Sequence, residues 1–331
     1  NVETVEISAG TSHKMLSEIY WLTATNRQIN KILAEHGDDI DVFLTRYAIS
    51  RGVLLSRIAK RVHDNNIITV LEVNSLGFHY INWKPLDRIV LKTELFLASY
   101  FDLLYVISEN LRQQILEVGY QGEISSIPNA SSPREKRINQ EISSEKAKPR
   151  FVYLGVFHKY YDFETLLNAF RQIASDYRVT LEFFGDGPKL ARTKELASNQ
   201  EKVYFYGRYK FGEINKLFNP NDILLLPYKA NKLTNIGSPI KLYEYLSFGL
   251  PIVASKVGQV GQILKDRNTG YLYPPGDIDK LVKVMRFVLE NPQHRRKVSN
   301  QALDEFLRKH TWKSRMNDLI SYVNAVRTVE V

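Results

Sequence analysis

The sequence has no cysteine, which excludes disulfide bonds, a thiolate nucleophile and any metal site with cysteine ligands. It has no apolar run approaching the roughly 18 residues that a membrane-spanning helix needs, so we expect no such helix. No Gly-x-Gly-x-x-Gly fingerprint follows a predicted strand, which argues against an NAD-dependent oxidoreductase. No two histidines stand at the spacing of metal ligands, and we expect neither a metal nor another cofactor.

The residues that are present describe a globular protein with excess positive charge. The chain has 331 residues, 44% hydrophobic and 24% charged, and at roughly 100 to 200 residues per domain this length favours two domains. Its 45 Lys and Arg residues outnumber 36 Asp and Glu residues, so the net charge is +9. This balance favours anionic partners, which are nucleic acid, an acidic membrane surface or phosphorylated substrates. We expect a cytoplasmic protein, peripheral at most at the inner face of a membrane.

Short apolar runs alternate with amphipathic segments along the whole chain, which is the pattern of strands and crossover helices in parallel sheets. We predict an α/β fold with two Rossmann-like, doubly wound parallel sheets that face one another across a cleft. The expected division is an N-terminal domain at 1–147, a C-terminal domain at 148–311 and a helix at 312–331 that returns to the N-terminal domain. Residues 128–150, with three prolines, several serines and mixed charges, suit a linker.

The apolar spacing predicts individual elements. The first half has predicted strands at 41–44, 67–73, 103–107 and 124–127, and predicted helices at 51–62, 86–100 and 109–118. The second half has predicted strands at 151–155, 179–184, 203–206 and 223–226. Ser108 directly follows a strand and is expected to cap the next helix. Ligands of open parallel sheets bind at the carboxyl ends of strands, so we expect the chemistry in the loops there.

The segment 235–251 carries the strongest local signal. Ser238 is a favoured N-cap residue and Pro239 a favoured first helical residue, so we expect a helix to begin there. Free amides at its start, the positive end of the helix dipole and a lysine side chain would together bind an anion. These amides belong to Ile240, Lys241 and Leu242, and the lysine is Lys241.

Two further residues fit the same anion site. Gly237 has no side chain and lets a phosphate approach the backbone. Glu244 lies about one helical turn beyond Lys241, where its carboxylate could accept hydrogen bonds from two ribose hydroxyls. An ordinary capped helix with an exposed Lys–Glu pair explains the same residues, and this alternative stays open.

Motifs spread over most of the chain match one known family in order and spacing. They are Ser108-Glu109, Ile127-Pro128-Asn129, Phe184-Gly185-Asp186-Gly187-Pro188, Val203-Tyr204-Phe205-Tyr206-Gly207, Asp222 to Pro227, Asn235 to Pro251 and Gly270 to Asp277. From Asp39 onward the chain resembles the family-four retaining glycosyltransferases of the GT-B fold. The resemblance implies metal-independent transfer of a hexose, with retention, from a nucleotide diphosphate sugar such as UDP-glucose. The implied acceptor is a glycan or a lipid-linked molecule in polysaccharide biosynthesis.

Carried over residue by residue, the resemblance gives roles in the donor site. Glu244 matches the second carboxylate of the family's Glu-x7-Glu signature, which holds the ribose hydroxyls. The first carboxylate falls on Ile236, so we expect Asn235 or Ser238 to substitute for it. Gly207, Arg208 and Tyr209 match the segment that holds the base, and Gly185 begins a turn that also matches.

The loop after the first strand of the second domain departs from the family pattern. Gly155 matches, but the next residue, an arginine that binds the diphosphate in the family, is Val156 here. Lys159 and His158 lie in the same loop, and we expect Lys159 to supply the missing charge beside Lys241. The two lysines are then the candidate catalytic cations for the leaving diphosphate. His158 is equally well explained as a surface residue.

The acceptor side has fewer matches. Family members often carry a histidine after the second strand of the first domain, where this chain has Glu72 and Asn74. These two are our candidate catalytic residues on that side. An anionic membrane surface would be contacted by basic residues of the first domain, which are Arg51, Arg57, Lys60 and Arg61.

Two rival classes of function remain. A nucleic-acid-binding protein would explain the positive charge, but no recognised nucleic-acid-binding motif is present, and we expect no nucleic acid partner. An NAD-dependent oxidoreductase would explain two doubly wound domains. Calorimetry with UDP and with NAD separates these classes from the glycosyltransferase.

Overall fold

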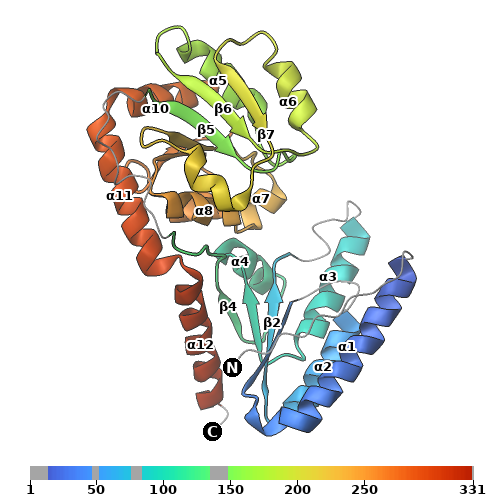
Figure 1. The fold of residues 1–331 in the computed structure, drawn as a ribbon. Coiled ribbons are helices and arrows are strands. Elements are labelled where there is room, and N and C mark those ends of the chain that lie inside the picture. Colours follow the sequence, from blue (N-terminus) through green and yellow to red (C-terminus); the bar gives the residue numbers. More distant parts are fainter. Residues whose placement is uncertain (1–13, 47–51, 76–83, 135–147, 330–331) are drawn as a thin grey trace. The chain divides into compact units, whose positions relative to one another are not determined.

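The computed structural model describes residues 14–46, 52–75, 84–134 and 148–329. The chain divides into two compact units, one formed by Asn1–Ile127 with Leu319–Val331 and the other by Pro128–Asp318. Each unit contains one parallel β-sheet with helices around it (Figure 1), so the predicted α/β class with two parallel sheets is confirmed. Part of the expected linker, residues 135–147, lies outside the described residues.

The first unit is built on a four-stranded parallel sheet with the strand order β1-β2-β3-β4. The strands are β1 (Val42–Arg46), β2 (Ile68–Val73), β3 (Leu103–Val106) and β4 (Ile124–Ser126). The helices are α1 (Lys14–His36), α2 (Gly52–His63), α3 (Lys84–Ala98) and α4 (Glu109–Glu117), with a 3-10 turn at Gly37–Asp39. Ser108 caps α4 as predicted, because its hydroxyl accepts a hydrogen bond from the amide of Leu111 at 3.1 Å.

Helices cover both faces of this sheet (Figure 1). The last helix, α12 (Trp312–Val329), packs Leu319 and Val323 against Ile68 and Val70, two residues that alternate to the same face of β2. On the other side, apolar residues of α1 and α2 pack together beside β1. The end of the chain therefore completes the core of the first unit.

The second unit is built on a six-stranded parallel sheet with the order β10-β9-β8-β5-β6-β7. The strands are β5 (Arg150–Leu154), β6 (Thr180–Phe184), β7 (Val203–Gly207), β8 (Ile223–Leu226), β9 (Ile252–Ser255) and β10 (Tyr271–Tyr273). The strand order reverses between β5 and β8. Such a reversal opens a crevice at the carboxyl ends of the strands, where doubly wound sheets bind their ligands.

Helices and short turns connect these strands. They are α5 (Phe163–Ile173), α6 (Leu190–Leu196), the 3-10 helix η5 (Phe211–Leu217), α7 (Lys232–Ile236), α8 (Ile240–Phe248), α9 (Gly258–Ile263), α10 (Ile278–Glu290) and α11 (Pro292–Lys309). The strands β5, β8 and β9 are buried almost throughout, as expected for the middle of a parallel sheet. The core is continuous from α5 and α10 to α8 and α11.

The start of α8 differs from the prediction. The helix begins at Ile240, and its N-cap position is Pro239, which has no side-chain hydrogen bond to the helix. The prediction that Ser238 caps this helix is wrong. Its hydroxyl instead accepts a hydrogen bond from the backbone amide of Asn129 at 2.9 Å and lies 3.3 Å from the hydroxyl of Tyr243. A long-range contact thus replaces the local one.

Candidate functional site

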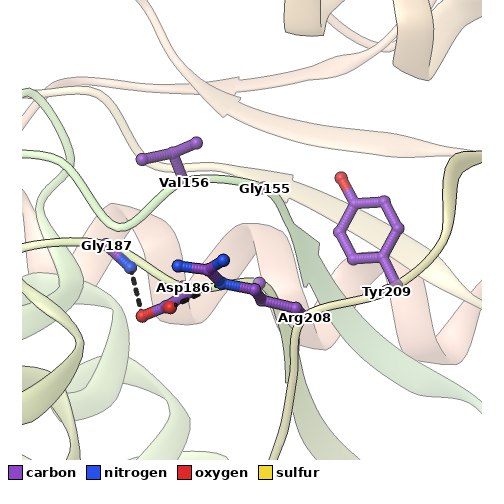
Figure 2. Close-up of a pocket in the computed structure, with 7 residues that line it drawn as sticks. Gly155, Val156, Asp186, Gly187, Arg208 and Tyr209 are labelled. Carbon is purple, nitrogen blue, oxygen red and sulfur yellow. Dashed lines mark hydrogen bonds and ion pairs between the residues drawn. The ribbon is translucent and has the colours of Figure 1, made fainter.

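A pocket of about 390 Å³ lies at the carboxyl ends of three neighbouring strands of the second unit (Figure 2). Each strand contributes the residues that directly follow it. The lining residues are Gly155 and Val156 after β5, Gly185, Asp186 and Gly187 after β6, and Arg208 and Tyr209 after β7. The pocket therefore lies at the carboxyl edge of the sheet, where ligands of parallel sheets bind, and it extends from β5 beside the strand-order reversal towards β7.

Two glycines make this arrangement possible. Gly155 has φ +140°, and a Cβ atom on it would lie 1.5 Å from Nζ of Lys241. Gly185 has φ +135°, and a Cβ atom on it would lie 1.9 Å from the carbonyl oxygen of Gly155. Only glycine adopts such a backbone without strain and leaves room for both neighbours. The loops after β5 and β6 and the Lys241 side chain are therefore in close contact, and neither glycine position has room for a side chain.

Lys241 extends from the first turn of α8 to the end of β5. Its Nζ donates a hydrogen bond to the carbonyl oxygen of Leu154 at 2.5 Å. Three tyrosine rings surround this ammonium, with centroids 5.3, 5.9 and 5.8 Å away, and they belong to Tyr153, Tyr161 and Tyr245. Burial lowers the pKa of Lys241 to about 8, and the nearby Glu244 carboxylate opposes this shift. A partly buried cation at a strand end is suited to hold an anion.

Hydroxyl groups of the tyrosines around Lys241 make hydrogen bonds with neighbouring groups. Tyr245 accepts a hydrogen bond from the amide of Leu154 at 2.9 Å, and its own hydroxyl lies 3.1 Å from the carbonyl oxygen of the same residue. The hydroxyls of Tyr161 and Tyr228 lie 3.0 Å apart. Burial raises the pKa of Tyr161 to about 12, so it stays a neutral donor at physiological pH. None of these residues was a predicted site residue.

Glu244 lies on α8, one turn after Lys241, and is partly buried. Within the described part of the chain, its carboxylate takes part in no hydrogen bond and no ion pair. Its negative charge raises the pKa of Tyr209, although burial is the larger cause. A partly buried carboxylate without a partner has its acceptor capacity available for a ligand.

The amides at the start of α8 are not all available. The amide of Leu242 donates to the carbonyl oxygen of Pro239 at 3.0 Å. Ile240 and Lys241 are the first two residues of the helix, and the side chain of Ile240 is exposed. The predicted anion site therefore reduces to the amides of Ile240 and Lys241 with the lysine side chain.

The residues before α8 occupy different environments. Ile236, at the position of the family's first carboxylate, is buried, with 6% of its surface exposed. Asn235 is exposed at the end of α7, whereas Ser238 is buried and already bonded to Asn129. Gly237 follows α7 in an extended conformation. Asn235 is therefore the more accessible of the two residues that we expected to substitute for the carboxylate.

The loop after β5 does not bring Lys159 into the pocket lining. Lys159 is exposed, and its Nζ lies 5.7 Å from the centre of the Tyr160 ring. The His158 ring lies tilted against the Tyr160 ring, with the two centroids 4.2 Å apart, and its buried Nδ1 has no hydrogen-bond partner among the described residues. Val156 is exposed at the pocket. Lys241, rather than Lys159, is the lysine that reaches the end of β5.

Arg208 and Asp186 form an ion pair across the pocket lining, as Figure 2 shows. Nε of Arg208 donates to Oδ2 of Asp186 at 2.8 Å, and this bond is the main cause that lowers the pKa of Asp186. Both side chains are exposed, so the pair is easily exchanged for contacts with a ligand. Gly207, at the end of β7, accepts from the amide of Gly185 at 2.7 Å and joins the two loops.

The two candidates in the first unit lie at the end of β2. Glu72 is buried and accepts a hydrogen bond from Arg46 Nη2 at 2.8 Å. Tyr105 stands beside it in register on β3, and burial, followed by Glu72, raises the pKa of this tyrosine. Glu72 is thus part of a cross-strand cluster. Asn74 differs, because its buried Oδ1 has no hydrogen-bond partner among the described residues.

The basic residues expected to meet a membrane lie on α2. Arg57, Lys60 and Arg61 are exposed, and Arg51 lies outside the described residues. Arg61 donates to the side chains of Asn26 and Asn30 on α1 at 3.0 and 2.5 Å. No helix among the described residues has the length and apolar character needed to cross a bilayer. Over the same residues, no three acidic or histidine side chains cluster as metal ligands would, and metal independence stays a prediction.

Comparison with known proteins decides the family. Residues 134–305, more than half of the chain, match the family described as glycosyl transferases group 1. The chain is a group 1 glycosyltransferase. The pocket after β5, β6 and β7 and the whole of α8 lie within the matched part of this glycosyltransferase.

Curated relatives resemble the glycosyltransferase at low identity. It is 24% identical to the sulfoquinovosyl transferase SQD2 of Arabidopsis thaliana over 175 residues, which are 52% of this chain and 32% of that protein. It is 20% identical to the N-acetyl-alpha-D-glucosaminyl L-malate synthase of Bacillus anthracis over 275 residues, which are 80% of this chain and 69% of that protein. The chain thus spans about a third of the length of the first relative.

Solved structures share the fold of the glycosyltransferase. The apo form of the lipopolysaccharide outer core galactosyltransferase WaaB superposes with a TM-score of 0.69 at 15% identity, covering 96% of this chain and 82% of that one. HepE of Anabaena, in complex with UDP and glucose, superposes with a TM-score of 0.66 at 14% identity, covering 96% and 84%. At these identities the likeness shows the fold alone, which is GT-B.

Proposed function

We propose that this glycosyltransferase transfers a hexose from a UDP-sugar, with retention of the anomeric configuration, to a glycan or lipid-linked acceptor in polysaccharide biosynthesis. One observation supports it most. Glu244, a carboxylate without a partner among the residues that the structure describes, lies one helical turn from a partly buried lysine that reaches the end of β5. These two groups suit the two ends of a nucleoside diphosphate, because the carboxylate accepts from ribose hydroxyls and the ammonium binds the diphosphate.

The pocket supports the same ligand. Gly155, Gly185 and Gly187 line the pocket, and because they have no side chains, the two loops and the Lys241 ammonium come close together at the strand ends, where a diphosphate would bind. Tyr209 and Arg208 on the third loop would contact the base. The neighbour HepE has been solved with UDP and with UDP-glucose, and we extend this donor class to the present chain. WaaB, a galactosyltransferase, makes a hexose a reasonable sugar.

In the proposed reaction, the bond between the anomeric carbon and the diphosphate oxygen breaks first. The Lys241 ammonium and the amides of Ile240 and Lys241 stabilise the negative charge that grows on the diphosphate. The acceptor hydroxyl attacks from the same face, and its proton passes to the departing phosphate oxygen. Charge stabilisation therefore comes from this chain's own cations and dipoles. Asn74, whose Oδ1 has no hydrogen-bond partner in the described part of the chain, is our candidate to orient the acceptor.

Calorimetry with the full chain tests the donor class. We expect micromolar-range binding of UDP, weaker binding of GDP and no binding of NAD. A screen of UDP-hexoses then identifies the sugar, and proton NMR of the product reads the anomeric configuration. Binding of NAD instead of any nucleoside diphosphate would support the oxidoreductase, and an inverted product would contradict retention.

The exposed positive charge of α2 supports a proposal for where in the cell the reaction takes place. Arg57 and Lys60 are exposed on α2, and such residues near an anionic lipid surface each contribute on the order of 1 kcal/mol to binding. We propose that the enzyme meets its acceptor at the inner face of a membrane in the cytoplasm. Sedimentation with lipid vesicles tests this step separately from donor binding.

A further inference from the structure

A short segment ahead of β5, residues 128–134, is fixed along α8. At its start, Asn129 donates from its backbone amide to Ser238 Oγ at 2.9 Å and from its side chain to the carbonyl oxygen of Ser238 at 2.6 Å. Two residues later, Ser131 forms a parallel bridge with Thr311, between α11 and α12. These contacts hold the segment against the second unit and determine where its last described residue, Arg134, can lie.

Arg134 reaches the same helix that carries Glu244. Its Nε donates to Ser247 Oγ at 3.2 Å, and its guanidinium carbon lies 4.1 Å above the centre of the Phe248 ring. Ser247 Oγ in turn donates to the backbone carbonyl of Glu244 at 2.6 Å. A hydrogen-bond chain therefore runs from Arg134 through Ser247 to the residue that carries the unpartnered carboxylate.

The charges around Arg134 point to the same carboxylate. Burial lowers the pKa of Arg134, whereas the Glu244 carboxylate and then the Tyr209 hydroxyl act in the opposite direction. Lys241 also lies within electrostatic reach of Glu244. Two cations from distant parts of the sequence thus act on one carboxylate. This arrangement offsets the cost of removing water from Glu244 when a ligand covers it.

We propose that Arg134 is a positioning residue of the donor site, which keeps the Glu244 carboxylate directed at the ribose hydroxyls of the nucleotide. The proposal rests on the proposed function, because it requires Glu244 to bind ribose. Arg134 acts through Glu244 and through the hydrogen-bond chain at Ser247. Its loss should therefore be felt by the ribose hydroxyls more than by the diphosphate.

Paired ligands separate these two ends of the nucleotide. Calorimetry measures the affinities of the wild type, Arg134→Met and Arg134→Lys for UDP and for 2′-deoxy-UDP. The wild type should prefer UDP, and Arg134→Met should lower the affinity for UDP by about tenfold or more, as expected for a charge-assisted contact. The affinity for 2′-deoxy-UDP should change much less, and Arg134→Lys should restore part of the preference.

Arg286→Met is the matched control. Arg286 is another arginine of the second unit, and its Nη2 forms an ion pair with Oδ2 of Asp176 at 2.9 Å on the exposed surface of α10. The control should keep both affinities and the preference for UDP. Thermal unfolding of each variant shows whether it is folded, and if Arg134→Met does not fold, the ratio in Arg134→Lys decides.

The outcomes are distinct. An equal loss of affinity for both ligands, or an unchanged preference for UDP, overturns the role of Arg134 and leaves the proposed function intact. If the wild type binds another nucleoside diphosphate more tightly, that nucleotide and its 2′-deoxy form replace the pair, and the same ratio decides. If the wild type binds no nucleoside diphosphate, the proposed function fails and the role of Arg134 fails with it.

Discussion

The Nζ atom of Lys241 and the backbone of Gly155 occupy one small space at the end of β5. A Cβ atom on Gly155 would lie 1.5 Å from this Nζ, which donates to the adjacent carbonyl oxygen of Leu154 at 2.5 Å. The lysine therefore brings a positive charge from α8 to the loop where Val156 stands in place of an arginine. Glycine at position 155 and lysine at position 241 depend on each other.

The substitution Gly155→Ala should displace the Lys241 ammonium from its position. We expect donor turnover to fall by about as much as in Lys241→Ala, because the methyl group takes the space of Nζ. The strained φ of +140° should also lower the free energy of unfolding by about 1–3 kcal/mol. Steady-state kinetics and urea unfolding measure the two effects.

Gly276→Ala is the control for backbone strain. Gly276 also has a positive φ, +78°, but a Cβ atom there would meet nothing within 4 Å. This variant should lose comparable stability and keep its turnover. If Gly155→Ala turns over as well as Gly276→Ala, Lys241 does not need its present position.

The affinity for UDP should fall as the pH rises above about 8. Burial lowers the pKa of Lys241 to about 8, so the lysine loses its proton in this range and with it its attraction for the diphosphate. The terminal phosphate of the ligand has a pKa of about 6, so it is already ionised above about pH 8 and its charge does not change in this range. Above the pKa of the lysine, the affinity should fall with pH until it reaches that of Lys241→Met.

Calorimetry in buffers with different ionisation enthalpies measures the proton that binding takes up. At about pH 8.5 the wild type should take up part of a proton, since the ligand favours the charged lysine, and Lys241→Met should take up none.

The free energy of unfolding should change with pH in the opposite direction to the affinity. The unfolded lysine keeps its proton up to about pH 10.4, so the free energy of unfolding should rise between about pH 8 and that value relative to Lys241→Met. A flat affinity profile would contradict the expected loss of affinity, and a pH-independent difference in unfolding free energy would contradict the lowered pKa of Lys241.

Removing the lysines one at a time tests which of them acts in catalysis. Lys241→Ala should lower turnover by roughly 100- to 1,000-fold, the typical loss for one preorganised donor to a developing oxyanion. Lys159→Ala should lose less, because Lys159 is exposed, whereas the Lys241 ammonium is held at the end of β5 by its hydrogen bond to Leu154. The loss should fall on turnover more than on donor affinity, since the diphosphate gains charge as the bond breaks. Normal turnover in both variants would move the anion elsewhere, for example to Arg208.

The predicted elements that proved correct share strong local signals. The strands of both sheets are short apolar runs, and Ser108 caps α4 through a contact only three residues away. Helix α1 was not predicted, because its apolar residues do not repeat along one clear face. Local periodicity thus identifies a strand or a capped helix, but not a helix whose formation depends on packing against α2.

Candidate site residues, too, were predicted where their signal is local in the sequence. Glu244 and Lys241 were predicted because they stand one helical turn apart in sequence. Tyr153 and Tyr161 beside Lys241 and the proposed role of Arg134 were missed, because these residues come from segments far away in the chain. The same cause explains Ser238, whose hydroxyl bonds to Asn129 rather than to its own helix. A sequence pattern does not contain such contacts.

The substitution Glu244→Gln tests the ribose contact directly. It keeps the size of the side chain but removes the charge that strengthens two hydrogen bonds, each worth about 1.5 to 3 kcal/mol with a carboxylate. We expect a loss of at least about tenfold in affinity for UDP and little change for 2′,3′-dideoxy-UDP, both measured by calorimetry. Unchanged affinity for UDP in a folded variant would remove Glu244 from the site.

The double substitution of Arg57 and Lys60 by glutamine should weaken binding to anionic vesicles by about tenfold or more, since each charge contributes on the order of 1 kcal/mol. Arg61 is kept, because its contacts with Asn26 and Asn30 join α2 to α1.

The matched control replaces Arg296 and Lys297, two exposed basic residues of α11 in the other unit, and should bind as the wild type does. Sedimentation at increasing salt measures the affinities, and salt should release the wild type as it screens these charges. Equal sedimentation of the wild type with neutral and anionic vesicles would contradict the proposed membrane contact, and equal losses in both double variants would assign it to net charge rather than to α2.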